Sequence, residues 1–321
     1  MNFLITGGAG FIGSHLAEAL VARGDRVIVY DDLSTGRLSN LKSIMKKKNF
    51  SFIKGDILDK RLLGGAIKRV DMVFHLAAVV GVRYVLEHPL KTLEVNVRGT
   101  ENVLSLAHGY RKKVGIASSS EVYGKSENFP LKEDDDRVMG ATAITRWSYA
   151  ATKAMDEFMA LAYFREKKLP TLIVRFFNIC GPRQTGRYGM VIPRLVEEAL
   201  KGEPLTIYGD GKQTRSFTYV ADAISAVLAL SSIRKAYGQI FNLGSREVVS
   251  IEELALKIKE MTASSSPLVY IPYQEAYGRD FEDMRHRRPD ITKLEKFLGF
   301  SPETKLEEII RSTIEYMKGK K

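Results

Sequence analysis

The first thirty-two residues constrain the fold more than any other part of the chain. A short apolar run over 3–5 leads into a glycine-rich turn, and helical periodicity follows over 14–23. A second run of β-branched residues, over 26–30, ends in two acids. This order of strand, turn, helix, strand and acid predicts a parallel βαβ unit at the start of an α/β domain.

The glycine-rich turn suits a dinucleotide. Its glycines, Gly7, Gly10 and Gly13, are spaced three apart. With this spacing the first tightens the turn, the second admits a pyrophosphate to the backbone, and the third lets helix and strand pack closely. The N–H groups and positive dipole end of the helix would then face the phosphates. Asp31 can accept a hydrogen bond from a ribose 2′-hydroxyl and would repel a 2′-phosphate, so the sequence favours NAD over NADP.

Strands and helices continue to alternate, which predicts an α/β fold with a doubly wound parallel sheet (a Rossmann fold). We expect strands over 50–54, 71–76, 113–117 and 171–177, and long helices over 89–108 and 147–168. Ligands bind beyond the carboxyl ends of such strands. Five predicted strand ends should therefore meet in one crevice, at Asp31, Asp56, Ala77, Ser119 and Asn178.

The pattern changes after residue 177, which predicts a second, smaller domain of mixed α/β structure. A turn-rich loop occupies 181–189, and the run over 239–243 reads as a strand that rejoins the main sheet. We therefore expect an NAD-binding domain over 1–177, rejoined by about 212–244. The second, substrate-binding domain would comprise 178–211 and 245–321.

Composition narrows the classes of function. The single cysteine, Cys180, excludes an intrachain disulfide and fits a reducing cytoplasm. No apolar stretch approaches the roughly 18 residues that a membrane span needs, and no signal-peptide pattern opens the chain. The five histidines lack metal-ligand spacing, so no metal site is expected. These features predict a cytoplasmic protein without membrane contact.

The net charge of +11 raises the question of nucleic-acid binding. The basic residues are scattered apart from two runs, at 46–48 and 318–321, and neither run is interleaved with aromatic residues. We therefore expect no nucleic-acid partner. A basic surface also suits anionic small molecules.

Tyr149 and Lys153 are the candidate proton-transfer pair. They lie four apart on the expected helix over 147–168 and so share a face. An ammonium group beside a phenol lowers the phenol pKa, and lowering it from about 10 to about 7 needs roughly 4 kcal/mol, which Lys153 and the positive nicotinamide ring of NAD could supply together in a dry site. The same spacing recurs at Tyr163–Lys167, Tyr208–Lys212 and Tyr316–Lys320. We favour Tyr149 because a serine cluster ends the strand before its helix and a dinucleotide turn opens the chain.

Four features now stand together: the glycine-rich turn, Ser119 before Val122-Tyr123-Gly124, Tyr149 with Lys153, and the sequence Arg-Phe-Phe-Asn at 175–178. Together they resemble the extended short-chain dehydrogenase/reductases, which are NAD-dependent epimerases, dehydratases and decarboxylases of nucleotide sugars. The resemblance covers essentially the whole chain. It implies that a tyrosinate takes the proton of the sugar 4-hydroxyl while the C4 hydride passes to NAD.

The resemblance also implies roles for individual residues. Ser119 would bind the sugar 4-oxygen, and arginines would bind the diphosphate bidentately. NAD would be bound by Gly7, Gly10, Phe11, Ile12, Gly13, Asp31, Asp32, Asp56, Ile57, Leu76, Ala77, Ala78, Asn96, Tyr149 and Lys153. The UDP-sugar would be bound by Asn178, Arg183, Arg215 and Arg285. By analogy alone, the long helices over 89–108 and 147–168 suggest a homodimer.

The segment Ser119-Ser120-Glu121 points to one branch of the family. Simple 4-epimerases usually lack an acid there, whereas UDP-glucuronate decarboxylases resemble this chain, and Arg287 matches an arginine that they use. The sequence therefore predicts UDP-glucuronate decarboxylation through a 4-keto sugar, with Glu121 and Arg287 as catalytic residues. A UDP-sugar 4-epimerase remains an alternative, because the 182–189 loop is not typical of xylose synthases. A non-catalytic NAD sensor is a third, although it would not need the intact Ser119, Tyr149 and Lys153.

Overall fold

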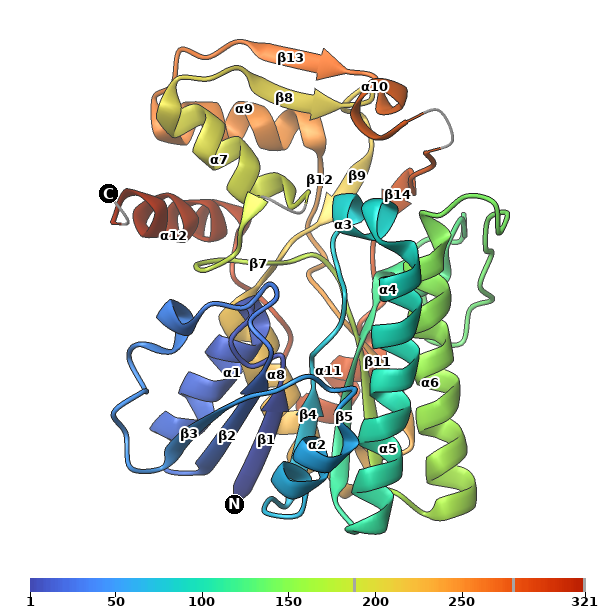
Figure 1. Cartoon of the computed structure of the whole chain (residues 1–321). Helices are drawn as coiled ribbons and strands as arrows, with labels where there is room; N and C mark the ends of the chain where they lie inside the picture. The colour runs from blue at the N-terminus through green and yellow to red at the C-terminus, as the bar shows by residue number, and fades with distance from the viewer. Residues whose placement is uncertain (187–188, 279–280, 320–321) are drawn as a thin grey trace.

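A seven-stranded sheet dominates the structure, a computed structural model that describes residues 1–186, 189–278 and 281–319 (Figure 1). Its strands are β1 (Asn2–Thr6), β2 (Arg26–Asp31), β3 (Phe50–Lys54), β4 (Met72–His75), β5 (Lys113–Ser119), β6 (Thr171–Phe176) and β11 (Gln239–Leu243). They lie in the order β11-β6-β5-β4-β1-β2-β3, and all neighbours are parallel. The predicted doubly wound sheet is confirmed, and the 239–243 strand rejoins it. The order reverses between β1 and β4, where such sheets open a ligand crevice.

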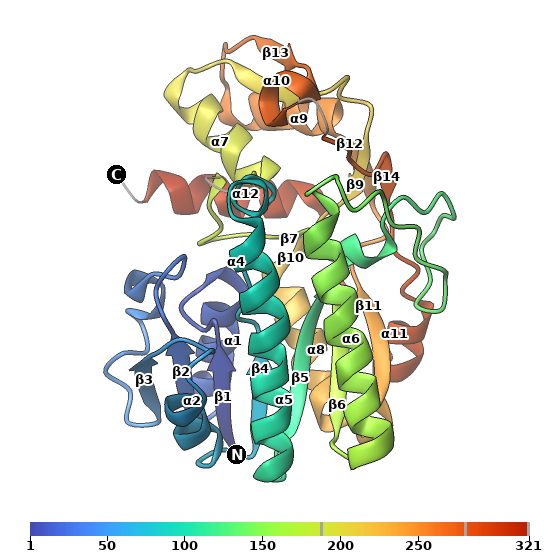
Figure 2. The same cartoon turned by 45° about the vertical axis from the view of Figure 1, so that its right-hand side comes forward.

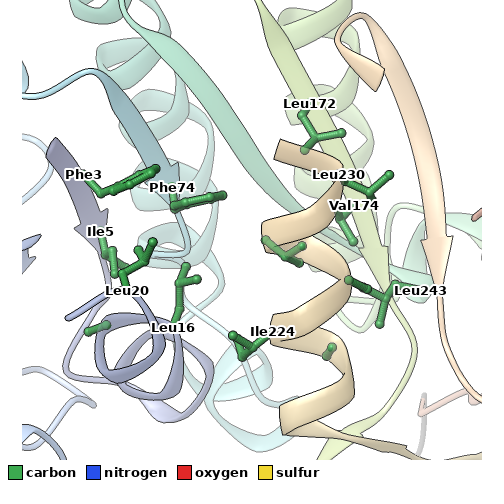
Figure 3. Close-up of a cluster of buried hydrophobic side chains, with 14 of the residues drawn as sticks. Phe3, Ile5, Leu16, Leu20, Phe74, Leu172, Val174, Ile224, Leu230 and Leu243 are labelled. Carbon is green, nitrogen blue, oxygen red and sulfur yellow. The ribbon is translucent and has the colours of Figure 1, made fainter. Parts of the chain in front are cut away.

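Helices cover both faces of the sheet. One face carries α1 (Phe11–Ala22), α8 (Val220–Ser232) and α11 (Thr292–Leu298), and the other carries α2 (Lys60–Ile67), α5 (Gly99–Gly109) and α6 (Trp147–Lys167). Figure 3 shows the first core, where Phe3 and Ile5 share a cluster with Leu16 of α1. Leu4, between them in sequence, is buried in the second core. Strand β1 is thus apolar on both faces, as a central parallel strand must be.

A smaller layer lies beyond the carboxyl ends of the main strands, at the top of Figure 1. Around its own apolar core pack α7 (Val191–Lys201), α9 (Ile251–Thr262), α12 (Leu306–Lys318) and the strand pair β8 (Leu205–Tyr208) and β13 (Leu268–Ile271). Two small sheets complete this region. They are β7 (Ile179–Cys180) with β10 (Thr218–Tyr219), and β9 (Thr214–Ser216) with β12 (Val248–Ser250) and β14 (His286–Arg287).

The expected helix over 89–108 is a helical run of three parts: α4 (Pro89–Leu93), a π-helical turn (Glu94–Arg98) and α5. It lies beside α6 at one side of the molecule (Figure 2). The helix expected over 14–23 begins earlier, at Phe11. Short elements that the sequence did not predict are α2, α3 (Val82–Glu87), α10 (Tyr273–Tyr277) and α11, and the 3₁₀ turns Leu38–Leu41, Ser120–Tyr123 and Arg234–Ala236.

Two residues of the turn-rich loop, Arg187 and Tyr188, lie outside the described residues, as do Lys320 and Lys321 of the basic tail. Among the helices that the structure describes, none combines the length and the apolar character that crossing a membrane requires.

Candidate active site

One cavity of about 900 Å³ opens at the carboxyl ends of the main strands, with walls from the sheet and from the smaller layer. It is lined by Ser119, Glu121, Tyr149, Lys153 and Arg287, the five residues predicted to be catalytic. Every residue predicted to bind the cofactor lines it too, except Asn96. The structure thus brings together residues that are more than 250 positions apart in the chain.

The glycine turn forms a cradle that side chains would fill. Gly7 has a φ of +69°, and a Cβ there would lie 2.7 Å from the backbone nitrogen of Ala77. A Cβ on Gly13 would lie 2.3 Å from the carbonyl oxygen of Gly7. The buried carboxylate of Asp31 accepts backbone N–H groups from Ala9 (2.9 Å) and Leu33 (2.8 Å), which fixes it at the cavity wall. This open backbone and fixed acid fit the pyrophosphate and ribose of NAD.

Asn96 does not line the cavity, and its role as a cofactor ligand stays a prediction. Its side chain accepts the Val79 N–H at 2.7 Å and donates to the Val79 carbonyl at 3.2 Å. It also donates to Thr152 on α6 at 3.2 Å. The π-helical turn aims Asn96 at the loop after β4, so it fixes a wall of the cavity from behind.

Tyr149 and Lys153 share the face of α6 that lines the cavity, as their spacing predicts, with Lys153 buried and Tyr149 half-buried. The Ser119 hydroxyl faces the Tyr149 phenol. The Lys153 ammonium donates to Asp156 at 2.9 Å. Burial raises the pKa of the Tyr149 phenol. The Lys153 charge lowers the same pKa by less, so the phenol pKa lies above its ordinary value. Lys153 alone therefore does not bring the phenol pKa below its ordinary value, and the sequence prediction relied on Lys153 together with the positive nicotinamide ring.

A second group of charges, here called the arginine cluster, comprises Glu121, Arg146, Arg215, Asp283 and Arg287. Glu121 is paired with Arg146 and, at 2.8 Å, with Arg287. Asp283 is paired with Arg215 at 2.8 Å and with Arg146 at 3.4 Å. All five line the cavity. They come from the 3₁₀ turn after β5, the start of α6, β9, β14 and the segment before β14.

The arginine cluster carries one excess positive charge, because three guanidinium groups face two carboxylates. The Nε atoms of Arg146 and Arg287 are buried and have no hydrogen-bond partner among the described residues. Burial alone would raise the pKa of Glu121, but Arg146 and Arg287 outweigh it, so that pKa lies well below its ordinary value. Glu121 is therefore a carboxylate across the working pH range, and the site can accept a further anion.

The residues predicted to bind the substrate have different surroundings. Asn178 lines the cavity and donates to the Ser216 carbonyl at 2.8 Å. Arg215 belongs to the arginine cluster. Arg183 also lines the cavity, but its guanidinium donates to Ser14 and Glu18 of α1.

Arg285, also predicted to bind the substrate, lies outside the cavity, and that role stays a prediction. It is paired with Asp210 at 2.8 Å, its side chain is 53% exposed, and it is not among the residues that line the cavity. The carboxylate of Asp210, in the turn after β8, draws its guanidinium to the surface. Of the two nearby arginines, only Arg287 reaches the site.

Sequence reasoning did not identify Arg146 and Asp283 as site residues. Arg146 stands three residues before Tyr149, one helical turn away, and that spacing was a usable signal. Asp283 gives no such signal, because it lies in an irregular segment. The sequence also gives no signal for an aromatic wall of the cavity, formed by Tyr208, Tyr277 and Phe281. The ring centroids of Tyr277 and Phe281 are 4.3 Å apart, and those of Tyr208 and Tyr277 are 5.3 Å apart.

The family model described as GDP-mannose 4,6 dehydratase matches residues 4–313. The chain belongs to this family of extended short-chain dehydrogenase/reductases. Its sequence is 45% identical over 316 residues to UDP-N-acetyl-alpha-D-glucosaminuronate decarboxylase of Bacillus cytotoxicus, covering 98% of this chain and 97% of the relative. It is 36% identical over 315 residues to UDP-glucuronic acid decarboxylase 1 of Danio rerio, covering 98% and 72%.

A solved structure extends the comparison. The UDP-glucuronic acid 4-epimerase from Bacillus cereus, in complex with UDP-glucuronic acid and NAD, is 30% identical, with a TM-score of 0.88 over 100% of both chains. The predicted family of NAD-dependent nucleotide-sugar enzymes is confirmed, and so is NAD as the family's cofactor. Within the described ranges, no three His, Cys, Asp or Glu side chains gather as a metal ion would need.

Proposed function

We propose that this enzyme decarboxylates a UDP-hexuronate through a 4-keto sugar, with NAD as its cofactor. The arginine cluster carries this proposal. A carboxylated sugar brings an anion, and the cluster offers one excess positive charge beside the candidate base Tyr149. The two decarboxylase relatives support the same reading. Residues 178–211 and 245–321 would provide most of the nucleotide-sugar contacts.

The first step is oxidation at C4 of the sugar. Tyr149, as the phenolate, accepts the proton of the 4-hydroxyl, and Ser119 donates a hydrogen bond to the same oxygen. Lys153 stabilises the phenolate by its charge. NAD, bound over the glycine turn and Asp31, would supply the hydride acceptor.

The second step follows from the chemistry of the ketone. With C4 oxidised, the carboxylate on C5 belongs to a β-keto acid. The bond between C5 and the carboxylate carbon can then break, with its electron pair delocalised onto the C4 oxygen as carbon dioxide leaves. The resulting enolate takes up a proton at C5 and becomes a 4-keto pentose. Ser119 and Tyr149 stabilise the C4 oxygen, and Arg287 orients the departing carboxylate. Glu121 fixes Arg287 through their 2.8 Å ion pair.

The identity of the hexuronate is a finer question with two candidates. UDP-glucuronate is the sugar predicted from the sequence. UDP-N-acetylglucosaminuronate is favoured by the 45% identical relative from Bacillus cytotoxicus. The two sugars share the C5 carboxylate and differ at C2, so the arginine cluster serves both.

The deciding experiment is to incubate the enzyme and NAD with each sugar and to follow carbon dioxide and product mass. We expect carbon dioxide from at least one of them. We also expect Glu121→Gln and Arg287→Ala to suppress carbon dioxide release more than they suppress NAD reduction. Conversion of UDP-glucuronate to UDP-galacturonate without loss of carbon would replace this function with 4-epimerisation. Absence of turnover with every UDP-sugar would favour the NAD sensor.

We also propose a cytoplasmic location, because the buried cysteine Cys180 forms no disulfide, which suits a reducing compartment. We further propose that the chain forms a homodimer through the exposed faces of α4 and α6. Apolar side chains stand out on those helices: Leu90 (68% exposed), Leu93 (43%), Met155 (47%) and Phe158 (55%). Sedimentation should give a dimer, and Phe158→Glu should shift it toward monomer. A wild-type monomer would contradict this assembly.

A further inference from the structure

Asp156 is a buried acid that the chemistry described above does not use. It lies on α6 with 0% exposure and accepts the Lys153 ammonium at 2.9 Å. Lys153 itself is only 3% exposed. A lysine buried this deeply tends to lose its proton, because burial disfavours the charged form. Its charge in this site therefore needs an anion close by.

Asp156 is the only carboxylate paired with Lys153 among the described residues. The neighbouring acid Glu157 is already committed, because Arg175 binds both its oxygens at 2.8 Å and Ser118 donates to it. From the opposite side, Glu121 belongs to the arginine cluster.

The other groups that face this pair add no charge. Thr100 of α5 faces Asp156, and its hydroxyl lies 3.1 Å from Nε2 of His75. The second carboxylate oxygen of Asp156, Oδ1, is buried and has no hydrogen-bond partner among the described residues. Burial and the nearby Lys153 lower the pKa of His75 to about 3, so that imidazole is neutral. The remaining neighbour is the Tyr149 phenol, which is the group that Lys153 serves.

We propose that Asp156 is a positioning residue that keeps the buried Lys153 protonated and directed at Tyr149. This inference rests on the proposed function for its catalytic meaning, but the ion pair itself can be tested without turnover. Burial is the main reason that the pKa of the Tyr149 phenol lies above its ordinary value, and the Asp156 charge adds a smaller contribution in the same direction.

The direct test is an NMR titration of Lys153 in the full chain with NAD bound, using lysine labelled with ¹³C at Cε and Lys153→Arg to assign the signal. We expect Asp156→Asn to lower the Lys153 titration midpoint by about one pH unit or more. Glu166→Gln, at an exposed position of the same helix, is the matched control and should leave the midpoint unchanged. An equal midpoint in wild type and Asp156→Asn would overturn the proposal, whatever sugar the enzyme uses.

The second readout is the pH dependence of kcat. As pH rises through the lowered Lys153 pKa, Asp156→Asn should lose activity that wild type keeps, whereas a merely structural role would reduce kcat equally at every pH. If Asp156→Asn does not fold, Thr100→Val serves instead, because it removes a polar hydroxyl that faces the carboxylate. The Lys153 midpoint should then shift in the same direction by less, and no shift would count against the proposal. If the wild-type enzyme released no carbon dioxide but Asp156→Asn still shifted the Lys153 midpoint, the proposed function would be refuted and this inference would stand.

Discussion

The two charged groups of the cavity are built in opposite ways. Tyr149, Lys153 and Asp156 stand on one face of one helix, and the lysine and aspartate balance each other. The arginine cluster is assembled from five separate segments and keeps one excess positive charge. A neutral pair suits proton transfer, in which charge appears and disappears on the phenol. An unbalanced cluster suits a ligand that carries its own negative charge.

The sharpest way to break this comparison is to remove the phenol hydroxyl. Tyr149→Phe should lower kcat by about 10²- to 10⁴-fold, because a positioned base is lost while the ring still packs. Binding of NAD and UDP should remain close to wild type. Rates from product mass spectrometry and affinities from calorimetry would check both statements.

Tyr163→Phe is the matched control, since Tyr163 lies on the same helix with a lysine four residues later. Its ring packs edge-on against His108, away from the cavity. Activity should be nearly unchanged. Equal losses in the two variants would show that the catalytic pair lies elsewhere.

A second prediction uses two arginines of the same segment with opposite surroundings. Arg287→Met should destabilise the fold by about 3–5 kcal/mol, because it removes a partner from a buried ion pair, and should abolish decarboxylation. Arg285→Met should cost about 0–1 kcal/mol, since its pair with Asp210 is exposed. Urea unfolding and carbon dioxide release measure these effects. Similar effects from the two substitutions would mean that the charge balance of the arginine cluster determines neither the stability of the fold nor decarboxylation.

The same contrast explains what the sequence could predict. The βαβ unit and the Tyr149–Lys153 face follow from local periodicity, so each was visible within a few dozen residues. The seven-stranded sheet followed from the repetition of that pattern. The pairing of Glu121 with Arg146 and Arg287 depends on tertiary contacts, and spacing along the chain carries little information about it.

The two predicted site residues that do not line the cavity illustrate the same limit. Arg285 and Arg287 are two residues apart, yet Arg285 is paired with the exposed Asp210 and Arg287 with Glu121 in the cavity. Asn96 lies in a π-helical turn, which redirects its side chain toward Val79. Neither the partner acid nor the wider turn can be inferred from residue type alone.

A third, smaller effect concerns the cofactor half of the cavity. Stripped wild-type enzyme should bind NAD more tightly than NADP by at least about tenfold, roughly 1.4 kcal/mol, because the Asp31 carboxylate would face a 2′-phosphate. Asp31→Asn should narrow this preference by removing the repulsion. Fluorescence titration with both dinucleotides measures the ratio. Tighter binding of NADP by wild type would refute the ribose assignment.

The smallest expected effect tests the arginine cluster through the pH dependence of stability. The pKa of Glu121 is lower in the folded chain than the ordinary value of about 4.3, because two guanidinium groups outweigh the effect of its burial. The Glu121 carboxylate therefore contributes stability that is complete above the unfolded pKa and is lost as pH falls below it toward the folded pKa. For one such group the slope is at most about 1.4 kcal/mol per pH unit, which amounts to a few degrees in Tm.

Glu121→Gln cannot take up that proton, so its stability should fall less steeply than wild type between about pH 5 and pH 2. Glu166→Gln removes an exposed carboxylate and should keep the wild-type slope. Because the slope is compared rather than the absolute stability, any packing cost of the substitution cancels. Parallel curves for wild type and Glu121→Gln would show that the two guanidinium groups do not hold this carboxylate ionised, and the cluster would then lose its distinction from the balanced pair on α6.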